Sequence, residues 1–505
     1  MSITFGQLSQ DATDRAVEYG VILRKKETSE ETSYVQQKAM QLFPITLWPS
    51  VYPKKHYEFL LQVQMDYNLL VDKLSSDVLL MESLQRIIQH DDFVRRLVEI
   101  YNKVSLTKQQ PISIAIQRCD YLLHIEHSEE ADSGIRVAPK LVEMNTIAPA
   151  FAAITENVAN VHKVLQVKYQ DGDFKEQYRG QEFLHLNVVN LFMMAMSDTV
   201  TIMHYFILDP DAVSMVCRAM AIAWKEYGQP KAAILMVINE NESNIFELGK
   251  FELKLAIEYQ IKVLRHTFGE LDNVATIKSD NRLIVNDTEI AIVYYRSGYH
   301  PNLFPTEKQW SAYLMLEQSQ AVKCPPISHH LCTLKRIQQV FSNPNVLESF
   351  FNDPTMLERI KSTLVGLYPL DEGPEGDEVI EMALKNPEKF VLKTQREATA
   401  KCYLDEDEDI REKLTQILKM ESRVTYTLMD RINYPTQEYA MVGNDSKHHL
   451  LQTCPEIGIF GVFVRNGEKV LMNSSAGYSV RHVSPNMDEI NSTGGALSSL
   501  MLTPS

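Results

Sequence analysis

Apolar residues recur at helical spacing through the first part of the chain. Between residues 10 and 105 they return every three or four positions, as in the run from Phe59 to Leu69, with charged residues between them. This spacing places the apolar side chains on one face of a helix. The pattern therefore predicts a helical leading region.

The pattern changes to strands at residue 111. PISIAIQRCDYLLHIEH, residues 111–127, is followed by a polar loop and then by KLVEMN, residues 140–145. Short, mainly apolar runs bounded by polar residues are typical of strands. We expect these two segments to pair.

A parallel α/β unit is predicted in the middle of the chain. The strand AAILMVIN (232–239), a helix around 245–259, and the strands IKVLRHTF and EIAIVYYR follow one another as strand, helix and strand. We expect a separate open-sheet domain at residues 209–333. Residues 1–208 would then hold the helical leading region and the first part of the core, and residues 334–505 the rest of it.

The last third is predicted to be antiparallel α+β. It carries the strands FVLKTQRE and YTLMDRI and the hairpin GIFGVFVRNGEKVLMNSS, whose Asn466-Gly467 pair suits a tight turn. The acidic run from Asp405 to Asp409 is interpreted as the start of a helix, where carboxylates complement the helix dipole.

Composition and charge narrow the class of protein. The 505 residues are 45% hydrophobic and 23% charged, which is ordinary for a globular chain of two or three domains. The net charge of −16 disfavours binding to nucleic acid or to an anionic membrane, because its field repels both. Small molecules or proteins are the expected partners.

The cysteines and the apolar runs indicate a cytoplasmic protein. Six cysteines are scattered without a CxxC pair, as expected for reduced thiols, and no stretch approaches the roughly 20 apolar residues of a membrane span. Secretion stays open, because the numbering need not include a cleaved signal segment.

Alternation along two strands suggests a site for phosphate and Mg²⁺. Residues two apart on a strand share a face, so Glu143 lies beside Asn145, and Lys393 lies on the same face as Gln395 and Glu397. Magnesium is usually held by one or two carboxylates plus substrate phosphates. From spacing alone, half-solvated edge strands explain the same pattern.

Three arginines follow apolar strand segments: Arg118, Arg296 and Arg481. The ends of strands in α/β folds are where ligands bind, and guanidinium groups bind carboxylates bidentately. Surface salt bridges are the alternative. His329-His330 and His448-His449 are interpreted as polar surface pairs, and no GxSxG, Walker or GxGxxG motif is present.

Taken in order, many segments resemble eukaryotic glutathione synthetases over nearly the whole chain. They include QVQMDYNLLVD, RCDY, VEMNTI, NESNIFE, IAIVYYRSGY, QAVKCPPI, FVLKTQRE, TLMDRI and EIGIFGVFVRNGEKVLMN. The resemblance implies an ATP-grasp fold with an inserted parallel-sheet domain for substrate, a lid region near the C-terminus, and a homodimer. It also implies an ATP- and Mg²⁺-dependent ligase that joins γ-glutamylcysteine to glycine through an acyl phosphate.

The resemblance carries roles onto particular residues. The implied metal ligands are Glu143, Asn145 and Glu397. The implied nucleotide-binding residues are Lys335, Lys393, Ala398, Thr399, Ala400, Met429, Asp430, Arg431, Ile432 and Glu456. The implied substrate-binding residues are Arg118, Ala148, Ala150, Glu242, Asn244, Leu248, Arg296, Ser297, Gly298, Tyr299 and Arg481, of which Arg118 and Arg481, with Lys393, would take part in catalysis.

The departures from the family pattern gather at the substrate and phosphate positions. Ala148 and Ala150 stand where the family has two serines, Leu248 where it has glutamine, and Ser297 where it has a carboxylate. The family's REGGG is REATA here, and a β-branched Thr399 is poorly suited to a loop that glycine allows to approach phosphate.

Three hypotheses follow from this mixture. The favoured one is a ligase of changed specificity, with a roomier and less polar donor pocket for a thiol-containing acid. The others are an ordinary glutathione synthetase whose pocket is compensated, and a non-catalytic descendant that binds a ligand or a protein.

Overall fold

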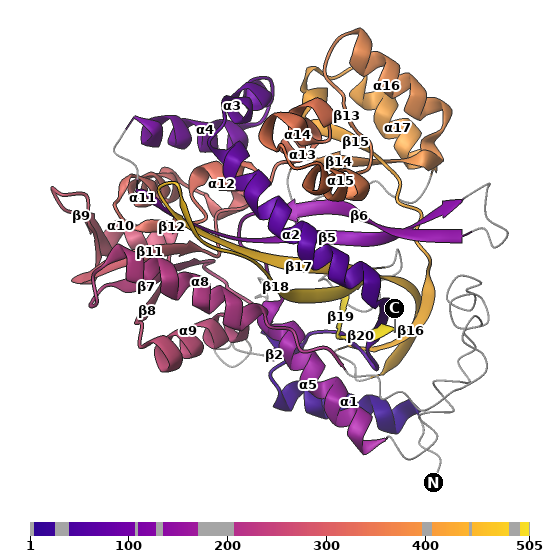
Figure 1. Ribbon diagram of the computed structural model, residues 1–505, viewed down its shortest axis with the longest axis horizontal. Coiled ribbons are helices and arrows are strands. Elements are labelled where there is room, and N and C mark those ends of the chain that lie inside the picture. The colour runs from indigo at the N-terminus through magenta and orange to yellow at the C-terminus, as the bar shows by residue number, and fades with distance from the viewer. Residues whose placement is uncertain are drawn as a thin grey trace.

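The protein is an α+β molecule built around a long antiparallel sheet and a shorter, mainly parallel one (Figure 1). The computed structural model describes residues 5–25, 40–106, 110–127, 135–169, 207–395, 407–443, 447–483 and 495–503. The predicted mixture of helix and sheet is confirmed.

The long sheet has seven strands in the order β16-β3-β19-β18-β17-β5-β6. Their bounds are β16 (Gln437–Val442), β3 (Ile45–Thr46), β19 (Ala496–Ser498), β18 (Lys469–Val483), β17 (His448–Asn466), β5 (Ile112–His127) and β6 (Ile135–Asn145). The predicted pairing of residues 111–127 with 140–145 is confirmed as β5–β6. In the β17–β18 hairpin Asn466 pairs with Lys469, so Gly467 and Glu468 form the turn, one position later than predicted; Gly467 has a positive φ of 58°.

The leading region is only partly helical. It holds α1 (Phe5–Glu18), α2 (Lys54–Ser75), α3 (Val78–Leu84) and α4 (Asp92–Ser105). Between α1 and α2 lie β1 (Ile22–Arg24), β2 (Met40–Leu42), β3 and β4 (Ser50–Pro53); β1 pairs with β2, and β4 pairs with β20 (Leu500–Thr503). The prediction of helix throughout was therefore wrong, because strands of two to four residues are too short to show a period.

The second sheet contains the predicted parallel unit. Strands β7 (Ala233–Ile238), β8 (Val263–Thr267), β11 (Thr288–Tyr295) and β12 (Val322–Cys324) pair in parallel, whereas β9 (Ala275–Ile277) and β10 (Leu283–Val285) extend the sheet antiparallel. Around it lie α8 (Ala212–Tyr227), α9 (Ile245–Tyr259), α10 (Phe268–Val274) and α11 (Glu307–Gln318) (Figure 1). The helix predicted at 245–259 is confirmed as α9.

A third, small sheet has its own hydrophobic core. It consists of β13 (Leu367–Pro369), β15 (Tyr426–Asp430) and β14 (Phe390–Thr394), covered by α16 (Pro374–Lys385) and α17 (Asp407–Ile417), and we call these five elements the small-sheet unit. Buried residues of β14, β15, α16 and α17 form one core cluster with Leu370, the residue after β13, and Tyr368 of β13 packs against it. Helix α17 begins inside the acidic run, as predicted.

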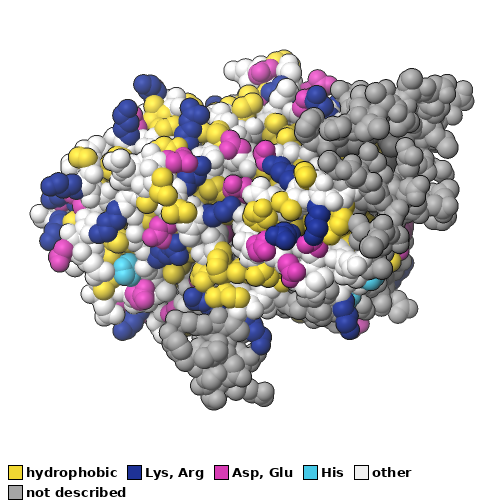
Figure 2. All heavy atoms as spheres, turned by 90° about the horizontal axis from the view of Figure 1, so that it is seen from below, with side chains coloured by type: hydrophobic (Ala, Val, Ile, Leu, Met, Phe, Trp, Pro, Cys, Tyr) yellow, Lys and Arg dark blue, Asp and Glu magenta, His cyan; other side chains and the backbone are white. Residues whose placement is uncertain are grey.

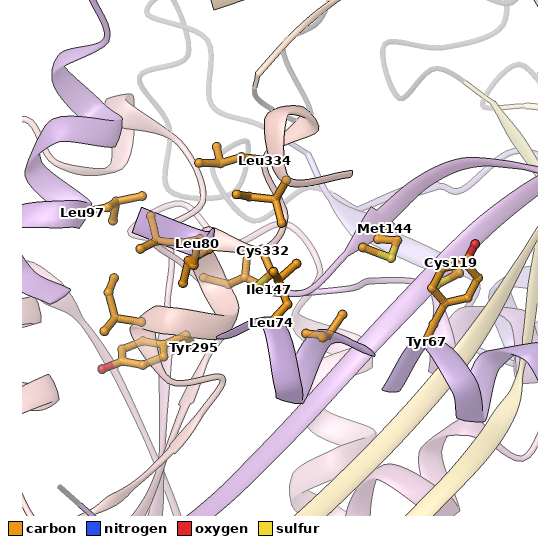
Figure 3. Close-up of a cluster of buried hydrophobic side chains, with 14 of the residues drawn as sticks. Tyr67, Leu74, Leu80, Leu97, Cys119, Met144, Ile147, Tyr295, Cys332 and Leu334 are labelled. Atoms are coloured by element: carbon orange, nitrogen blue, oxygen red, sulfur yellow. The ribbon is translucent and has the colours of Figure 1, made fainter. Parts of the chain in front are cut away.

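The largest core lies between the long sheet and the helices of the leading region. Figure 3 shows Tyr67 and Leu74 of α2 in one buried cluster with Cys119 of β5 and Met144 of β6. The same cluster takes in residues of α12 (Ile327–Leu331), α13 (Lys335–Phe341), α14 (Pro344–Phe350) and α15 (Pro354–Thr363).

His329 and His330 lie in this interior, so their prediction as a surface pair was wrong. Tyr313 of α11 lies within 2.9 Å of His330 Nδ1, and burial lowers the pKa of His330 to about 3. The surface prediction failed because α12 packs inside the core, where His330 is kept neutral and hydrogen-bonded.

Figure 2 shows the face seen from below, where hydrophobic side chains are interspersed with charged ones. Among the described residues no helix is both long and apolar enough to cross a membrane.

Candidate functional site

Several of the predicted site residues lie on one face of four neighbouring strands. In the order β6-β5-β17-β18, cross-strand partners include Glu143 with Asp120, Gly458 with Asp120, and Glu456 with Arg481. Directly paired residues share a face, and so do residues two apart. The face is therefore formed by Glu143, Asn145, Arg118, Asp120, Glu456, Gly458, Ser479 and Arg481.

Arg118 and Asp120 form a buried bidentate pair at the centre of this face. Arg118 donates from Nε to Asp120 Oδ1 at 2.6 Å and from Nη2 to Oδ2 at 2.8 Å. Asn145 donates from Nδ2 to Asp120 Oδ2 at 2.9 Å. Burial raises the pKa of Asp120, the pairing with Arg118 opposes this, and the nearby Glu456 and Glu143 add to it. Asp120 thus fixes the orientation of one predicted substrate residue and one predicted metal ligand.

Gly458 makes room for this pair. A Cβ atom on residue 458 would lie 2.6 Å from Asp120 Oδ1, 2.7 Å from Arg118 Cδ and 2.8 Å from Ser479 Oγ. These distances are shorter than any side chain tolerates without moving its neighbours. Glycine is required here because of close approach.

Glu143 is surrounded by cations. Lys335, the first residue of α13, donates to Glu143 Oε2 at 3.1 Å. Lys393 of β14 donates to the carbonyl of Val142 at 3.3 Å, at the point where the β5–β6 register skips Val142. Burial alone would raise the pKa of Glu143, but Lys335, Lys393 and Arg481 together hold it well below its usual range. The carboxylate is therefore ionised.

Glu456 and Arg481 face each other at the edge of the same surface. Arg481 donates to Glu456 Oε1 from Nη2 at 2.6 Å and from Nε at 3.2 Å. Arg481 keeps 29% of its side chain exposed, against 9% for Arg118. Arg481 is thus the arginine of this face that a ligand can reach more readily.

A second cluster lies at the carboxyl ends of the parallel strands. Arg296, directly after β11, donates to Glu247 Oε1 at 2.9 Å and to the carbonyl of Pro149 at 2.5 Å, and lies 3.3 Å from Tyr294 Oη. Burial raises the pKa of Glu247, and Arg296 opposes this. Both members of the pair are buried, so the predicted substrate residue Arg296 already has a carboxylate partner within the protein.

Glu242, Asn244 and Tyr299, three of the predicted substrate residues, lie together in this cluster. Glu242 accepts from the Asn244 backbone N–H at 2.8 Å and from Asn239 Nδ2 at 3.1 Å, while Asn239 Nδ2 also lies 3.4 Å from Tyr299 Oη. The side-chain oxygens of Asn239 and Asn244 are buried without a hydrogen-bond partner within the described residues. Unsatisfied buried acceptors beside a carboxylate suit a ligand that donates hydrogen bonds, such as an ammonium group.

The segment 146–151 connects the two clusters. The Pro149 carbonyl accepts from Arg296 and the Ala150 carbonyl accepts from Arg118 at 2.7 Å. Ala148 and Phe151 have positive φ angles of 49° and 81°. A non-glycine residue in this conformation is strained, and here two such residues turn successive carbonyls toward two arginines.

Three predicted placements were wrong. Leu248 is fully buried in the core between α8, α9 and the parallel sheet, so its side chain does not line the pocket; the first turn of α9 directs it inward. Arg118 and Arg481 lie within strands and not beyond them: Arg118 is well inside β5, and Arg481 is two residues before the end of β18. Arg296 alone follows the end of its strand, with Ser297 buried beside it and Gly298 at a positive φ of 99°.

The predicted hinge residues lie at the end of β15 and directly after it, where the small-sheet unit contacts the long sheet. Met429 and Ile432 pack with Leu122 and Cys454 in one apolar cluster. Asp430 accepts from the Gly366 backbone N–H at 2.9 Å, and the Arg431 backbone N–H donates to the Lys389 carbonyl at 2.7 Å. Glu397, Ala398, Thr399 and Ala400 lie outside the described residues.

Two site residues, Asp120 and Glu247, were missed in the sequence. Asp120 could have been found, since it follows Arg118 by two positions on a predicted strand. Glu247 carries no such signal, because it reaches Arg296 only when α9 packs against the parallel sheet.

Comparisons with known proteins identify the family. The family model described as eukaryotic glutathione synthase, ATP binding domain, matches residues 3–502. Glutathione synthetase of Homo sapiens is 33% identical over 479 residues, 94% of this chain and 92% of that protein. The chloroplastic glutathione synthetase of Solanum lycopersicum is 30% identical over 465 residues, 91% of this chain and 77% of that protein.

A solved structure has the same fold. A glutathione synthetase-like effector of Globodera pallida, in its apo form, superposes with a TM-score of 0.70 at 22% identity and covers 98% of this chain and 96% of its own. The resemblance seen in the motifs is thereby confirmed, and the chain belongs to the eukaryotic glutathione synthetase family.

Proposed function

We propose that the chain is an ATP- and Mg²⁺-dependent ligase with changed donor specificity. It would join a γ-glutamylcysteine-like carboxylate to a glycine-like amine through an acyl phosphate, as a homodimer. Nucleotide would lie between the small-sheet unit and the long sheet, in the manner of an ATP-grasp protein. We call the sheet face described above the polar face. The observation that carries the proposal is that Lys335 and Lys393, from distant parts of the chain, approach the strand of this face that holds Glu143 and Asn145.

The two lysines are placed to neutralise phosphate. Lys335 and Lys393 are both almost fully buried. Lys335 contacts the Glu143 carboxylate, and Lys393 contacts the carbonyl of Val142 on the same strand. Buried cations act strongly on a transferring phosphoryl group, because little water screens them. In this proposal they hold the γ-phosphate against the donor carboxylate, and the reachable Arg481 holds a substrate carboxylate.

The donor atoms of the face fit Mg²⁺. Glu143 is ionised. Asn145 donates its amide N–H to Asp120, so its amide oxygen points away from Asp120. Two hard oxygen ligands plus phosphate are an ordinary Mg²⁺ donor set, and bound Mg²⁺ would neutralise phosphate charge.

The donor end is where we place the change in specificity. At residues 148 and 150 methyl groups replace the family's hydroxyls, and only backbone carbonyls of this segment turn toward Arg118 and Arg296. The orphan acceptors of Asn239 and Asn244 suit an ammonium group of the donor. A donor that is less polar where it faces Ala148 should therefore bind better than γ-glutamylcysteine.

A second candidate is a ligand-binding protein without ligase activity. It is favoured by the pairing of Arg118, Arg296 and Arg481 with Asp120, Glu247 and Glu456, since each arginine is already neutralised within the chain. A binding protein needs no free cation for a reacting carboxylate.

Product analysis separates these candidates. The protein would be incubated with ATP, Mg²⁺, γ-glutamylcysteine and glycine, beside a panel of less polar thiol acids and other amines, and ADP and product masses would be measured. A new amide supports changed specificity, and glutathione at an ordinary enzymatic rate restores the standard activity. ATP left intact in every combination refutes the ligase and favours the binding protein.

A further inference from the structure

Two successive residues connect the small-sheet unit to the polar face. Lys335 and Arg336 open helix α13. Lys335 binds Glu143 of the long sheet, whereas Arg336 donates to Asp371 of the small-sheet side from Nη2 at 2.7 Å and from Nη1 at 3.2 Å. The first turn of α13 is therefore bonded to the long sheet through Lys335 and to the small-sheet side through Arg336.

A third bond joins the same turn to β14. The backbone N–H of Arg336 donates to Gln395 Oε1 at 2.8 Å, and Gln395 Nε2 donates to Thr427 of β15 at 3.2 Å. Gln395 is almost fully buried and lies two residues after Lys393 on the chain. A shift of Arg336 would therefore move Lys335 and Lys393 relative to Glu143.

Asp371 is itself held firmly. Its carbonyl accepts from Arg423 Nη2 at 3.0 Å, and Arg423 also binds Asp377 of α16 at 2.6 Å. A Cβ on Gly376 would overlap the Asp371 carbonyl, so the first turn of α16 packs directly on this backbone. Arg86 makes a weaker contact with the same carboxylate, at 3.3 Å from a side chain that is 63% exposed.

The small-sheet unit has few other firm attachments. Its main core is separate from the large core, and within the described residues the apolar packing between the unit and the long sheet consists of the small cluster that contains Met429 and Ile432. With little apolar packing across this junction, a bidentate charged pair has a large share in setting the orientation of the unit.

We propose that Arg336 and Asp371 are positioning residues, which hold Lys393 and Lys335 in register with Glu143. Neither residue touches the polar face. The proposal rests on the proposed function for its effect on nucleotide, but its effect on the small-sheet unit stands apart from any activity.

The test uses Asp371→Asn and Arg336→Lys, with Arg86→Gln as the matched control that shares the same carboxylate. Arg336→Lys keeps the charge and removes the fork, so it stays informative if Asp371→Asn folds poorly. The Kd for MgATP would be measured by calorimetry, and amide hydrogen exchange would be followed in β13, β14 and α16 without nucleotide.

We expect both variants to raise the Kd for MgATP about tenfold, which corresponds to one charged contact, and to speed exchange in β14. Arg86→Gln should change the Kd less than about twofold. The double variant Asp371→Asn/Arg336→Lys should be no worse than either single one, because both break one pair.

Two results would overturn the proposal. One is unchanged Kd and exchange in folded Asp371→Asn and Arg336→Lys; the other is an equal effect from Arg86→Gln. If the wild-type chain binds no MgATP, the proposed function fails, and exchange in β14 alone then decides whether the pair positions the small-sheet unit.

Discussion

The two faces of strands β6, β5, β17 and β18 differ in polarity, although the same four segments form both. One face presents Cys119, Tyr121, Met144, Ile457, Ile459, Tyr478 and Val480 to helix α2 and the large core. The other presents the charged residues of the polar face, with Arg118 and Asp120 at its centre. Each residue of one face is a chain neighbour of a residue of the other.

This contrast separates stability from function. The apolar face gains free energy from every side chain that it buries. The polar face holds ion pairs that must lose water, and a buried pair often contributes little net stability. Charges buried here, where apolar residues would pack more easily, support the binding site that we propose.

The largest loss of stability is expected on the apolar face. Ile459→Ala removes a fully buried side chain opposite the polar face and should lower the free energy of unfolding by roughly 2–5 kcal/mol. Urea denaturation would measure the loss. The folded fraction should bind MgATP within about twofold of wild type, and a large change in Kd would mean that the two faces are not separable.

Gly458→Ala tests the polar face at its tightest point. The added methyl would press on Arg118, Asp120 and Ser479, so we expect a loss of about 1–3 kcal/mol together with weaker MgATP binding. Gly249→Ala in α9 is the control, because its nearest neighbour would lie 3.8 Å away. Equal behaviour of the two variants in denaturation and binding would argue against crowding at Gly458.

His482, next to Arg481 on β18, should make the free energy of unfolding depend on pH. His482 lies within 2.6 Å of Ser50 Oγ and 2.9 Å of Thr453 Oγ1, and burial, with His162 nearby, lowers the pKa of His482 to about 3. An unfolded histidine titrates near 6.5, so between pH 6.5 and 3 the unfolded state binds a proton that the native state does not. Stability should therefore fall with falling pH, by roughly 1.4 kcal/mol per unit for this group.

Denaturation curves between pH 7 and 4 would measure this slope. His482→Gln should reduce the slope of unfolding free energy against pH by roughly 1.4 kcal/mol per pH unit, while lowering stability at pH 7. An unchanged slope in the variant would show that His482 is not the group that resists protonation.

The smallest effect on stability is expected where the effect on function is largest. Glu143→Gln keeps the shape of a partly exposed side chain and should cost about 1 kcal/mol, yet it removes the charge beside Lys335, so turnover should fall by roughly 100-fold or more. Glu126→Gln is a matched control on β5, because Glu126 lies near the strand end, away from Lys335, and its Oε1 is 3.5 Å from Lys140 Nζ. ADP release would measure both, and full activity of Glu143→Gln would refute the metal assignment.

Much of the secondary structure could be predicted from the chain. The pattern of the apolar residues predicted β5, β6, the parallel strands β7, β8 and β11, and α9, and alternation placed Glu143 beside Asn145. Strands β3 and β4 could not be predicted, because segments of two to four residues have no period and form only where a partner strand receives them.

Side-chain surroundings were less predictable than elements. Leu248 was placed in the pocket by resemblance, but the rotation of α9 on the parallel sheet buries it. The partners of the three arginines were not foreseen either. Glu247 reaches Arg296 only when α9 packs on the parallel sheet, and Glu456 comes opposite Arg481 only through the two register shifts of the β17–β18 hairpin.

The sequence by itself determined the alternation that gives these strands one apolar and one charged face, and it determined the family motifs. The tertiary structure decided which charges meet. Pairing of β5 with β17 brings Asp120 opposite Gly458 across more than 300 residues, and packing of α13 brings Lys335 to Glu143. Alternation is a local property of the backbone, whereas these meetings depend on long-range packing that no local pattern encodes.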